Sequence, residues 1–329
     1  MARGVIWAVG GGKGGVGKSM FSANIAVGLA KLGKKVIVVD TDLGGANLHS
    51  YLGISAPQST IYDFFLRRAS TLDELLMETS IDGLKFLPGS NEIVGMANPR
   101  YFTKLKFMRH IQQLQAEYIL LDVGAGTSYN TLDLFSMADT GIIVTIPEKP
   151  AIESAYGFIK ASIYRKLLTV FQKDRKLHDL IDQARNPIND AGIRNIRELI
   201  EKAGLVSPES VNDLKSTLDS IDLRIVVNFV QNSHEGSVGI KMVELVKKYL
   251  SITPEYVGGV PFSGKVRESL ANQTTLLMED SEDEASAALV FATQKLTIPR
   301  NSNAKQDEIN AQKEEAAVES ESESEENIK

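Results

Sequence analysis

Ten residues near the amino terminus carry the most specific chemistry in the chain: Gly10-Gly11-Gly12-Lys13-Gly14-Gly15-Val16-Gly17-Lys18-Ser19. Residues 12–19 match the pattern G-x-x-x-x-G-K-[ST], in which successive backbone N–H groups surround a phosphate without side-chain collisions. In this pattern the lysine reaches the β- and γ-phosphates and the hydroxyl ligates Mg²⁺. The alternative, a flexible glycine-rich turn, needs a chance match at a background glycine frequency of about 7%. The pattern therefore predicts a nucleoside-triphosphate site.

The elements on either side of this loop are the ones that the motif requires. Val5–Val9 is an apolar run typical of a buried strand, and Phe21, Ile25 and Leu29 recur at helical spacing within Met20–Leu32. The amino terminus of that helix adds a positive dipole beside the phosphates. The predicted nucleotide contacts in this region are Gly12, Gly14, Gly15, Val16, Gly17, Lys18, Ser19 and Met20.

Acidic residues stand at the ends of two further apolar runs. Asp40 closes K-V-I-V-V-D, with Asp42 two residues later, and Asp122 closes Y-I-L-L-D. Open α/β sheets bind ligands at the carboxyl ends of their strands. A carboxylate there can hold Mg²⁺ through water, because Mg²⁺ dehydrates reluctantly. We therefore predict Asp122 as a metal site with Ser19, while ordinary turn carboxylates remain the alternative for Asp40 and Asp42.

Strands and helices alternate along most of the chain. Strands are predicted at 5–9, 35–40, 84–87, 118–122, 141–146, 223–229 and 256–260, and helices at 20–32, 60–78, 101–116, 130–138, 236–250, 266–277 and 285–296. This order predicts an α/β fold: a doubly wound, mostly parallel sheet flanked by helices. Three or four helices are predicted in residues 151–222, a helical insertion that is either a partner-binding surface or an extension of the core.

Composition narrows the domain organisation and the class of protein. The net charge is −6, and residues 300–329, with nine acids and four bases, account for −5 of it. We expect one domain over residues 1–299 and a disordered acidic tail over 300–329. The nearly neutral body has no charge signature of nucleic-acid binding. The chain has no cysteine, and no apolar run approaches the roughly 20 residues of a spanning helix. Because the first strand begins almost at once, we expect no signal peptide and a cytoplasmic location.

The lysine at position 13 makes a family resemblance specific. K-G-G-V-G-K-S at residues 13–19 resembles the deviant Walker A motif of the MinD/ParA group of ATPases. In that group this lysine reaches the partner subunit's phosphates across a dimer interface, where a second cation acts like an arginine finger. The resemblance therefore implies catalytic roles for Lys13 and Lys18. From the loop alone, a solvated lysine would fit Lys13 equally well.

Three further stretches extend the resemblance. V-D-T-D-L-G-G-A-N-L resembles switch I, which implies that Asp42 polarises the attacking water and that Asp40 lies near the Mg²⁺ shell. L-L-D-V-G-A-G resembles a Walker B motif fused to switch II and implies a metal role for Asp122. In the group, the residues matching Asn228 and Pro261 read and flank adenine. An ordinary strand-end asparagine is the alternative for Asn228.

The resemblance covers residues 4–150 and 223–296 and is strongest to the MinD/FlhG branch. Members of that branch end in a basic amphipathic helix that inserts into membrane, whereas this chain ends in an acidic, Ser-rich segment that anionic lipid would repel. We therefore expect no direct membrane insertion, and the carboxyl terminus does not support peripheral membrane association. Only Met1-Ala2-Arg3 precede the first strand, so the activating amino-terminal segment of FlhG is not matched. Iron–sulfur relatives hold their clusters through cysteines, which this chain lacks.

The resemblance implies a Mg²⁺-dependent ATPase that acts as an ATP-gated dimerisation switch. It implies ATP and Mg²⁺ as cofactors, a homodimer in the ATP-bound form, a protein partner or activator, and a task in spatial positioning of a division site, flagella, a chromosome or another cargo. The alternative is a nucleotide-gated scaffold with negligible turnover, and a kinase would need an acceptor pocket that the sequence does not reveal. Arg100, Lys104, Lys106 and Arg109 are interpreted as a solvated helix face rather than a DNA or partner surface.

Overall fold

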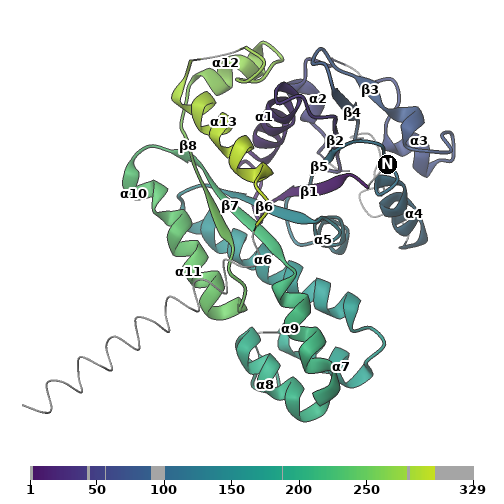
Figure 1. Cartoon of the computed structure of the whole chain (residues 1–329), viewed down its shortest axis with the longest axis vertical. Coiled ribbons are helices and arrows are strands. Elements are labelled where there is room, and N and C mark those ends of the chain that lie inside the picture. Colours follow the sequence, from purple (N-terminus) through teal and green to yellow (C-terminus); the bar gives the residue numbers. More distant parts are fainter. Residues whose placement is uncertain are drawn as a thin grey trace, which may run out of the picture. The chain divides into compact units, whose positions relative to one another are not determined.

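β-Strands and helices alternate along the chain, as Figure 1 shows. The structure is a computed structural model that describes residues 3–42, 45–55, 57–89, 101–186, 188–279 and 282–300, with the backbone alone at 101 and 102. The strands are β1 (Val5–Gly10), β2 (Val36–Asp40), β3 (Met77–Glu78), β4 (Leu84–Leu87), β5 (Tyr118–Asp122), β6 (Thr140–Thr145), β7 (Asp222–Val230) and β8 (Glu255–Pro261). The helices are α1 (Lys18–Lys31), α2 (Leu48–Tyr51), α3 (Ile61–Phe65), α4 (Tyr101–Ile111), α5 (Tyr129–Ser136), α6 (Lys149–Val170), α7 (Arg175–Ala184), α8 (Ile196–Val206), α9 (Val211–Asp219), α10 (Ser233–Gly236), α11 (Val238–Leu250), α12 (Lys265–Ala271) and α13 (Glu284–Thr297), with 3₁₀ turns η1 (Asp73–Leu75) and η2 (Pro208–Ser210).

The described strands form one eight-stranded sheet in the order β3-β4-β2-β5-β1-β6-β7-β8. All neighbours are parallel except β3 and β4. The chain leaves β1 toward β2 on one side and later adds β6, β7 and β8 on the other, so the order reverses at β1. Ligands of open α/β sheets bind beside the carboxyl end of a strand at such a reversal. The predicted fold is confirmed.

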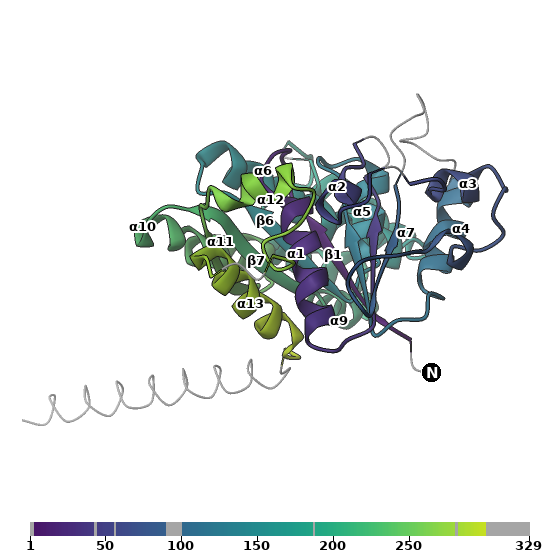
Figure 2. The ribbon, with the colours of Figure 1, turned by 90° about the horizontal axis from the view of Figure 1, so that it is seen from above.

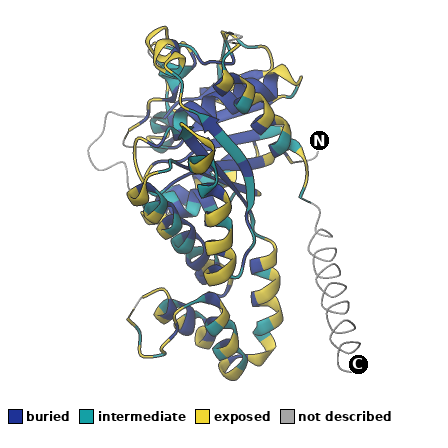
Figure 3. Ribbon diagram, turned by 90° about the vertical axis from the view of Figure 1, so that its left-hand side faces the viewer, coloured by how far each residue is buried: buried dark blue, intermediate teal, exposed yellow. Residues whose placement is uncertain are grey.

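Helices bury both faces of the sheet, which explains why its inner strands are apolar without alternation. All five residues of β2 and the last five of β1 are buried, and Figure 3 shows strands of the sheet in the dark blue of buried residues. On one face of the sheet, Gly28 of α1 lies against Thr293 of α13. The opposite face carries α5, α6 and α11 (Figure 2).

The segment Thr60–Glu78 differs from the single helix that the sequence predicts. Thr60 starts α3 through a capping box with Asp63, but the helix ends after five residues and Arg67 adopts a left-handed φ of 61°. Glu74 then accepts hydrogen bonds from the backbone of Ser70 and Thr71, which sets a turn, and β3 pairs with β4. Of the apolar residues predicted to form the core here, Ile61, Phe64, Leu72 and Leu75 are buried, whereas Phe65 and Leu76 are only partly buried, so most of this burial does not require a continuous helix.

Helix α4 corrects the interpretation of its basic residues for one position. Lys104 is buried and pairs with Asp133 of α5, so it does not belong to a solvated face. Lys106 lies 4.7 Å above the ring of Phe64 and stays exposed. Arg100 lies outside the described residues.

Residues 149–219 contain four helices, in agreement with the predicted three or four. The first, α6, packs on the sheet itself: Phe158 meets Phe135 of α5 edge to face at 5.0 Å. Helices α7, α8 and α9 pack on one another beyond it, and we call Arg175–Asp219 the α7–α9 segment. Each of its first two helices begins with a side-chain cap, from Asp174 and Asn195.

The chain divides into two compact units, Met1–Thr293 and Gln294–Lys329. Of the second unit the structure describes residues 294–300, which contain the last turn of α13. The predicted tail over 300–329 lies outside the described residues after Arg300, and its disorder stays a prediction. In the described ranges, every helix is too short or too polar to cross a lipid bilayer.

Candidate functional site

The loop between β1 and α1 approaches other parts of the chain so closely that two of its glycines are required. A Cβ at Gly12 would lie 1.9 Å from the Ser154 carbonyl oxygen. Gly17 has a left-handed φ of 88°, and a Cβ there would lie 2.1 Å from the Asn228 amide nitrogen. Gly17 caps α1 without a side chain, and the first turn of α1 contains no acid. Its unpaired N–H groups are therefore available to an anion.

The residues predicted to contact the nucleotide differ in how far they are buried. The side chains of Val16 and Met20 are buried in the core, so only their backbone faces the loop. Gly14 and Gly15 are exposed, and Gly15 has a φ of 80°. Lys18 is 9% exposed; burial lowers the pKa of its amine, while the charges of Asp122 and Asp42 oppose that shift. Lys18 therefore stands beside the two predicted acidic positions.

Asp40 and Asp122 are opposite one another at the ends of β2 and β5, and both are buried. Burial raises the pKa of each carboxyl group, and their mutual repulsion adds to the shift of Asp40. Asp122 accepts hydrogen bonds from Ser19 and, at 2.8 Å, from Ser22. A divalent cation would relieve this repulsion, so the hard oxygen donors fit Mg²⁺. Within the described ranges no group of three or more His, Cys, Asp or Glu side chains surrounds a metal position.

Asp40 also organises the loop that follows it, a role that sequence reasoning missed. Its two carboxylate oxygens accept hydrogen bonds from the backbone of Asp42 at 3.2 Å and Leu48 at 3.0 Å. The Asp42 carboxylate lies against Gly124, where a Cβ would be 3.0 Å from Asp42 Oδ1. The predicted switch I and switch II segments therefore meet at the Asp42 side chain.

Lys13 lies on the outer side of the loop. Its amine is 3.5 Å from Glu148 Oε2 at the amino terminus of α6, and the two side chains are 43% and 59% exposed. No motif pointed to Glu148. Lys13 is thus separated from the buried carboxylates that face Lys18.

Asn228 is fully buried and does not project into open space. Its Nδ2 donates to the Val16 carbonyl oxygen at 3.0 Å, and its Oδ1 accepts from the Phe229 backbone at 3.0 Å. The side chain therefore connects β7 to the phosphate loop, and adenine reading by Asn228 stays a prediction. Pro261 ends β8 opposite Val230, and the exposed ring of Phe262 next to it meets Phe229 edge to face at 6.2 Å.

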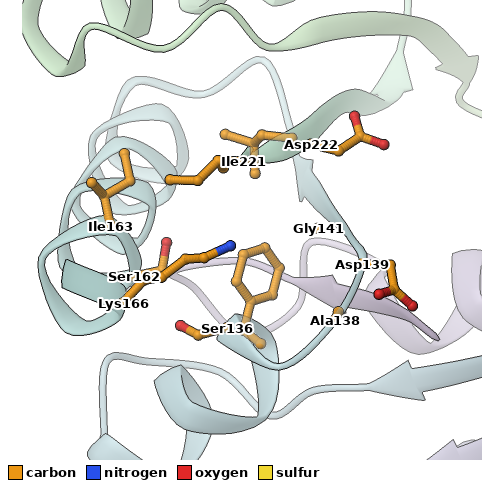
Figure 4. A pocket seen from close by; sticks show the side chains of 11 residues that line it. Ser136, Ala138, Asp139, Gly141, Ser162, Ile163, Lys166, Ile221 and Asp222 are labelled. Carbon is orange, nitrogen blue, oxygen red and sulfur yellow. The ribbon is translucent and has the colours of Figure 1, made fainter. Parts of the chain in front are cut away.

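A pocket also opens at the amino ends of β6 and β7. Figure 4 shows the Lys166 side chain and the hydroxyl of Ser136 among its lining residues, with Asp139 and Asp222 at its side. None of the predicted site residues lines it. The loop and the acids instead lie together at the carboxyl ends of β1, β2 and β5, the site of a P-loop nucleoside triphosphatase.

Comparisons with known proteins agree with this class. The family described as ParA, "NUBPL iron-transfer P-loop NTPase", matches residues 3–165. The antiactivator FleN of Pseudomonas aeruginosa is 24% identical over 298 residues, which cover 88% of this chain and 85% of FleN. An uncharacterized ATP-binding protein of Methanocaldococcus jannaschii is 31% identical over 196 residues, 59% of this chain and 70% of that protein. The septum site-determining protein MinD of Pyrococcus horikoshii, solved with Mg-ADP, has the same fold, with a TM-score of 0.59, 18% identity and coverage of 89% of this chain and 96% of that one.

The chain belongs to the ParA/MinD family of P-loop NTPases. The family described for residues 3–165 includes iron-transfer proteins, but this chain contains no cysteine to hold a cluster.

Proposed function

We propose that this chain is a Mg²⁺-dependent ATPase that works as a dimerisation switch. ATP binding favours a homodimer, and hydrolysis returns it to monomers. The observation that carries the proposal is the placement of two lysines on opposite sides of one loop: Lys18 is buried toward Asp122, and Lys13 is exposed. Family membership supports ATP as the nucleotide, and the Mg-ADP complex of the Pyrococcus MinD supports both nucleotide and metal.

The residues that would hold Mg²⁺ are Ser19 and Asp122, with Asp40 in the surrounding shell. When bound there, Mg²⁺ neutralises charge on the phosphate oxygens. Asp40 contributes mainly by position, because its oxygens already accept hydrogen bonds from the backbone of Asp42 and Leu48. It fixes the start of the loop that carries Asp42.

Hydrolysis would proceed by attack of water on the γ-phosphorus, with cleavage of its bond to the oxygen shared with the β-phosphate. Asp42 orients the water by accepting one of its hydrogen bonds. Lys18 and the N–H groups of the loop stabilise the charge on the phosphate oxygens, which is the main catalytic contribution in phosphoryl transfer. Because Asp42 lies against Gly124, the water-orienting residue and the second switch segment move together.

Lys13 would act in the partner subunit's site. To do so it must leave Glu148, which is a small obstacle because exposed ion pairs contribute about 0–1 kcal/mol. ATP bound between two subunits makes nucleotide state and dimerisation one coupled equilibrium.

The cellular task that we propose is spatial positioning, carried out with a protein partner or activator. The names of similar proteins support this proposal. The Pseudomonas protein is called an antiactivator, and the Pyrococcus MinD is called a septum site-determining protein. We propose a cytoplasmic location. The acidic residues 300–329 would be repelled by anionic lipid, so we do not propose membrane insertion by that segment.

The experiment compares wild type with Asp42→Ala by mass in solution and by phosphate release, each with ATP and Mg²⁺. A switch predicts that the variant dimerises on ATP and that its phosphate release falls by about 100-fold or more, because the water is no longer oriented. Absence of hydrolysis in both proteins, with ATP still bound, would favour the scaffold with negligible turnover.

A further inference from the structure

Helix α5 begins directly after the second switch segment, and its first residue is hydrogen-bonded to the α7–α9 segment. Ser128 caps the helix by accepting a hydrogen bond from the Thr131 backbone, and Tyr129 is its first residue. The hydroxyl of Tyr129 accepts a hydrogen bond of 3.0 Å from the guanidinium of Arg185, the C-cap residue that follows α7. Asp182, one turn earlier, orients Arg185 through an ion pair of 3.0 Å.

The same tyrosine also contacts α6. The guanidinium of Arg165 lies 4.9 Å from the centre of the Tyr129 ring, and it donates to both oxygens of Asp133, at 2.5 and 3.1 Å. Lys104 of α4 pairs with the same carboxylate. Charge-assisted hydrogen bonds to Asp133 therefore connect α5 with both α4 and α6.

The other side of α5 reaches the phosphate loop. The ring of Phe135 lies over Gly10, where a Cβ would be 2.8 Å from it, and also against Phe158 of α6. Helix α5 therefore contacts the start of the phosphate loop and directly follows Asp122–Gly126. A displacement of the second switch segment must move the first turn of α5, and Tyr129 with it.

We propose that Tyr129 and Arg185 are positioning residues through which the α7–α9 segment sets the position of switch II. The segment then senses the bound nucleotide and controls the rate of hydrolysis. This proposal rests on the proposed function, because it requires ATP to move Asp122–Gly126. It gives the helical insertion a task that a simple extension of the core would not have.

The test is a double-mutant cycle on the full chain: Tyr129→Phe, which keeps the ring above Arg165, Arg185→Met, and both together. Each single substitution should lower the rate of phosphate release at saturating ATP by roughly two- to fivefold, as expected for one hydrogen bond. The double variant should lose no more than either single variant. The ATP dissociation constant should not change, because neither residue touches the phosphate loop. Arg185→Lys keeps a donor and should restore part of the rate.

The matched control is Arg197→Met, the same substitution on α8, where Arg197 forms an exposed pair with Glu201 at 3.5 Å. Amide exchange gives a second readout: in wild type, ATP with Mg²⁺ should change exchange in residues 175–186, and Tyr129→Phe should reduce that change by at least half. Additive losses, equal losses in Arg197→Met, or ATP binding without any exchange change in α7 would overturn the proposal. Wild type that binds no ATP would instead refute the proposed function, and this proposal with it.

Discussion

The two ends of the candidate nucleotide site are built in different ways. At the phosphate end, Lys18, Asp40 and Asp122 are buried ionisable side chains at the ends of adjacent elements, and each of them lies near another ionisable side chain. At the end formed by β7 and β8, the Asn228 amide makes its hydrogen bonds with the backbone of this chain. Phe229 and Phe262 pack their aromatic rings against each other there. Chemistry therefore dictates residue types at the phosphate end, whereas packing dictates them at the other end.

Gly17 is where the two ends meet, and its replacement should have the largest effect. In Gly17→Ala the Cβ would collide with Asn228, and the φ of 88° alone costs about 1–3 kcal/mol in a residue with a side chain. We expect a loss of at least that size in the free energy of unfolding, measured with urea, and loss of ATP binding.

Gly14→Ala is the matched control for stability. Among the described residues no atom lies within 4 Å of a Cβ at Gly14. Its free energy of unfolding should stay within about 0.5 kcal/mol of wild type. Equal destabilisation by the two alanines would show that glycine content, and not the contact with Asn228, explains the loop.

Asn228→Ala distinguishes two roles of Asn228: holding the phosphate loop through its hydrogen bond to Val16, and recognising adenine. Loss of the hydrogen bond to Val16 should weaken binding of ATP and GTP alike, by about tenfold, because a buried acceptor loses its partner. The measurement is titration with fluorescent analogues of both nucleotides. A loss confined to the adenine nucleotide would instead assign adenine recognition to Asn228.

The paired acids predict a pH dependence with a defined sign. Burial raises the pKa of Asp40 to about 8 and of Asp122 to about 6. Between the ordinary carboxyl range and these values the folded chain binds more protons than the unfolded chain, so the metal-free protein loses stability as pH rises. Asp40→Asn should therefore gain stability relative to wild type from pH 5 to about pH 8. Urea unfolding at several pH values measures this, and a difference independent of pH would argue against the buried repulsion.

The phosphate end could be predicted from sequence because its signals are local. Gly12 to Ser19 are contiguous, and Asp40 and Asp122 each close an apolar strand. The parallel sheet was predictable for the same reason, since strands buried on both faces are continuously apolar.

The remaining features depend on contacts between distant residues. Asn228 bonds to Val16, 212 positions away, and Lys104 is buried by Asp133 of another helix. The break in Thr60–Glu78 is an exception with a local cause: the turn at Glu74 and the left-handed Arg67 interrupt a segment whose apolar residues have helical spacing. Glu148, which pairs with Lys13, lies in none of the sequence motifs that predicted the site. Tertiary contacts of this kind cannot be read from local spacing.

The most direct measurement is the mass in solution, by light scattering, of wild type and Lys13→Gln with ATP and Mg²⁺. We expect the wild-type mass to double from the 35.9 kDa of one chain with ATP but not with ADP. Lys13→Gln should remain monomeric and release no phosphate above background. Self-association and turnover that do not change in Lys13→Gln, or a wild-type chain that does not respond to ATP, would contradict ATP-gated dimerisation through Lys13.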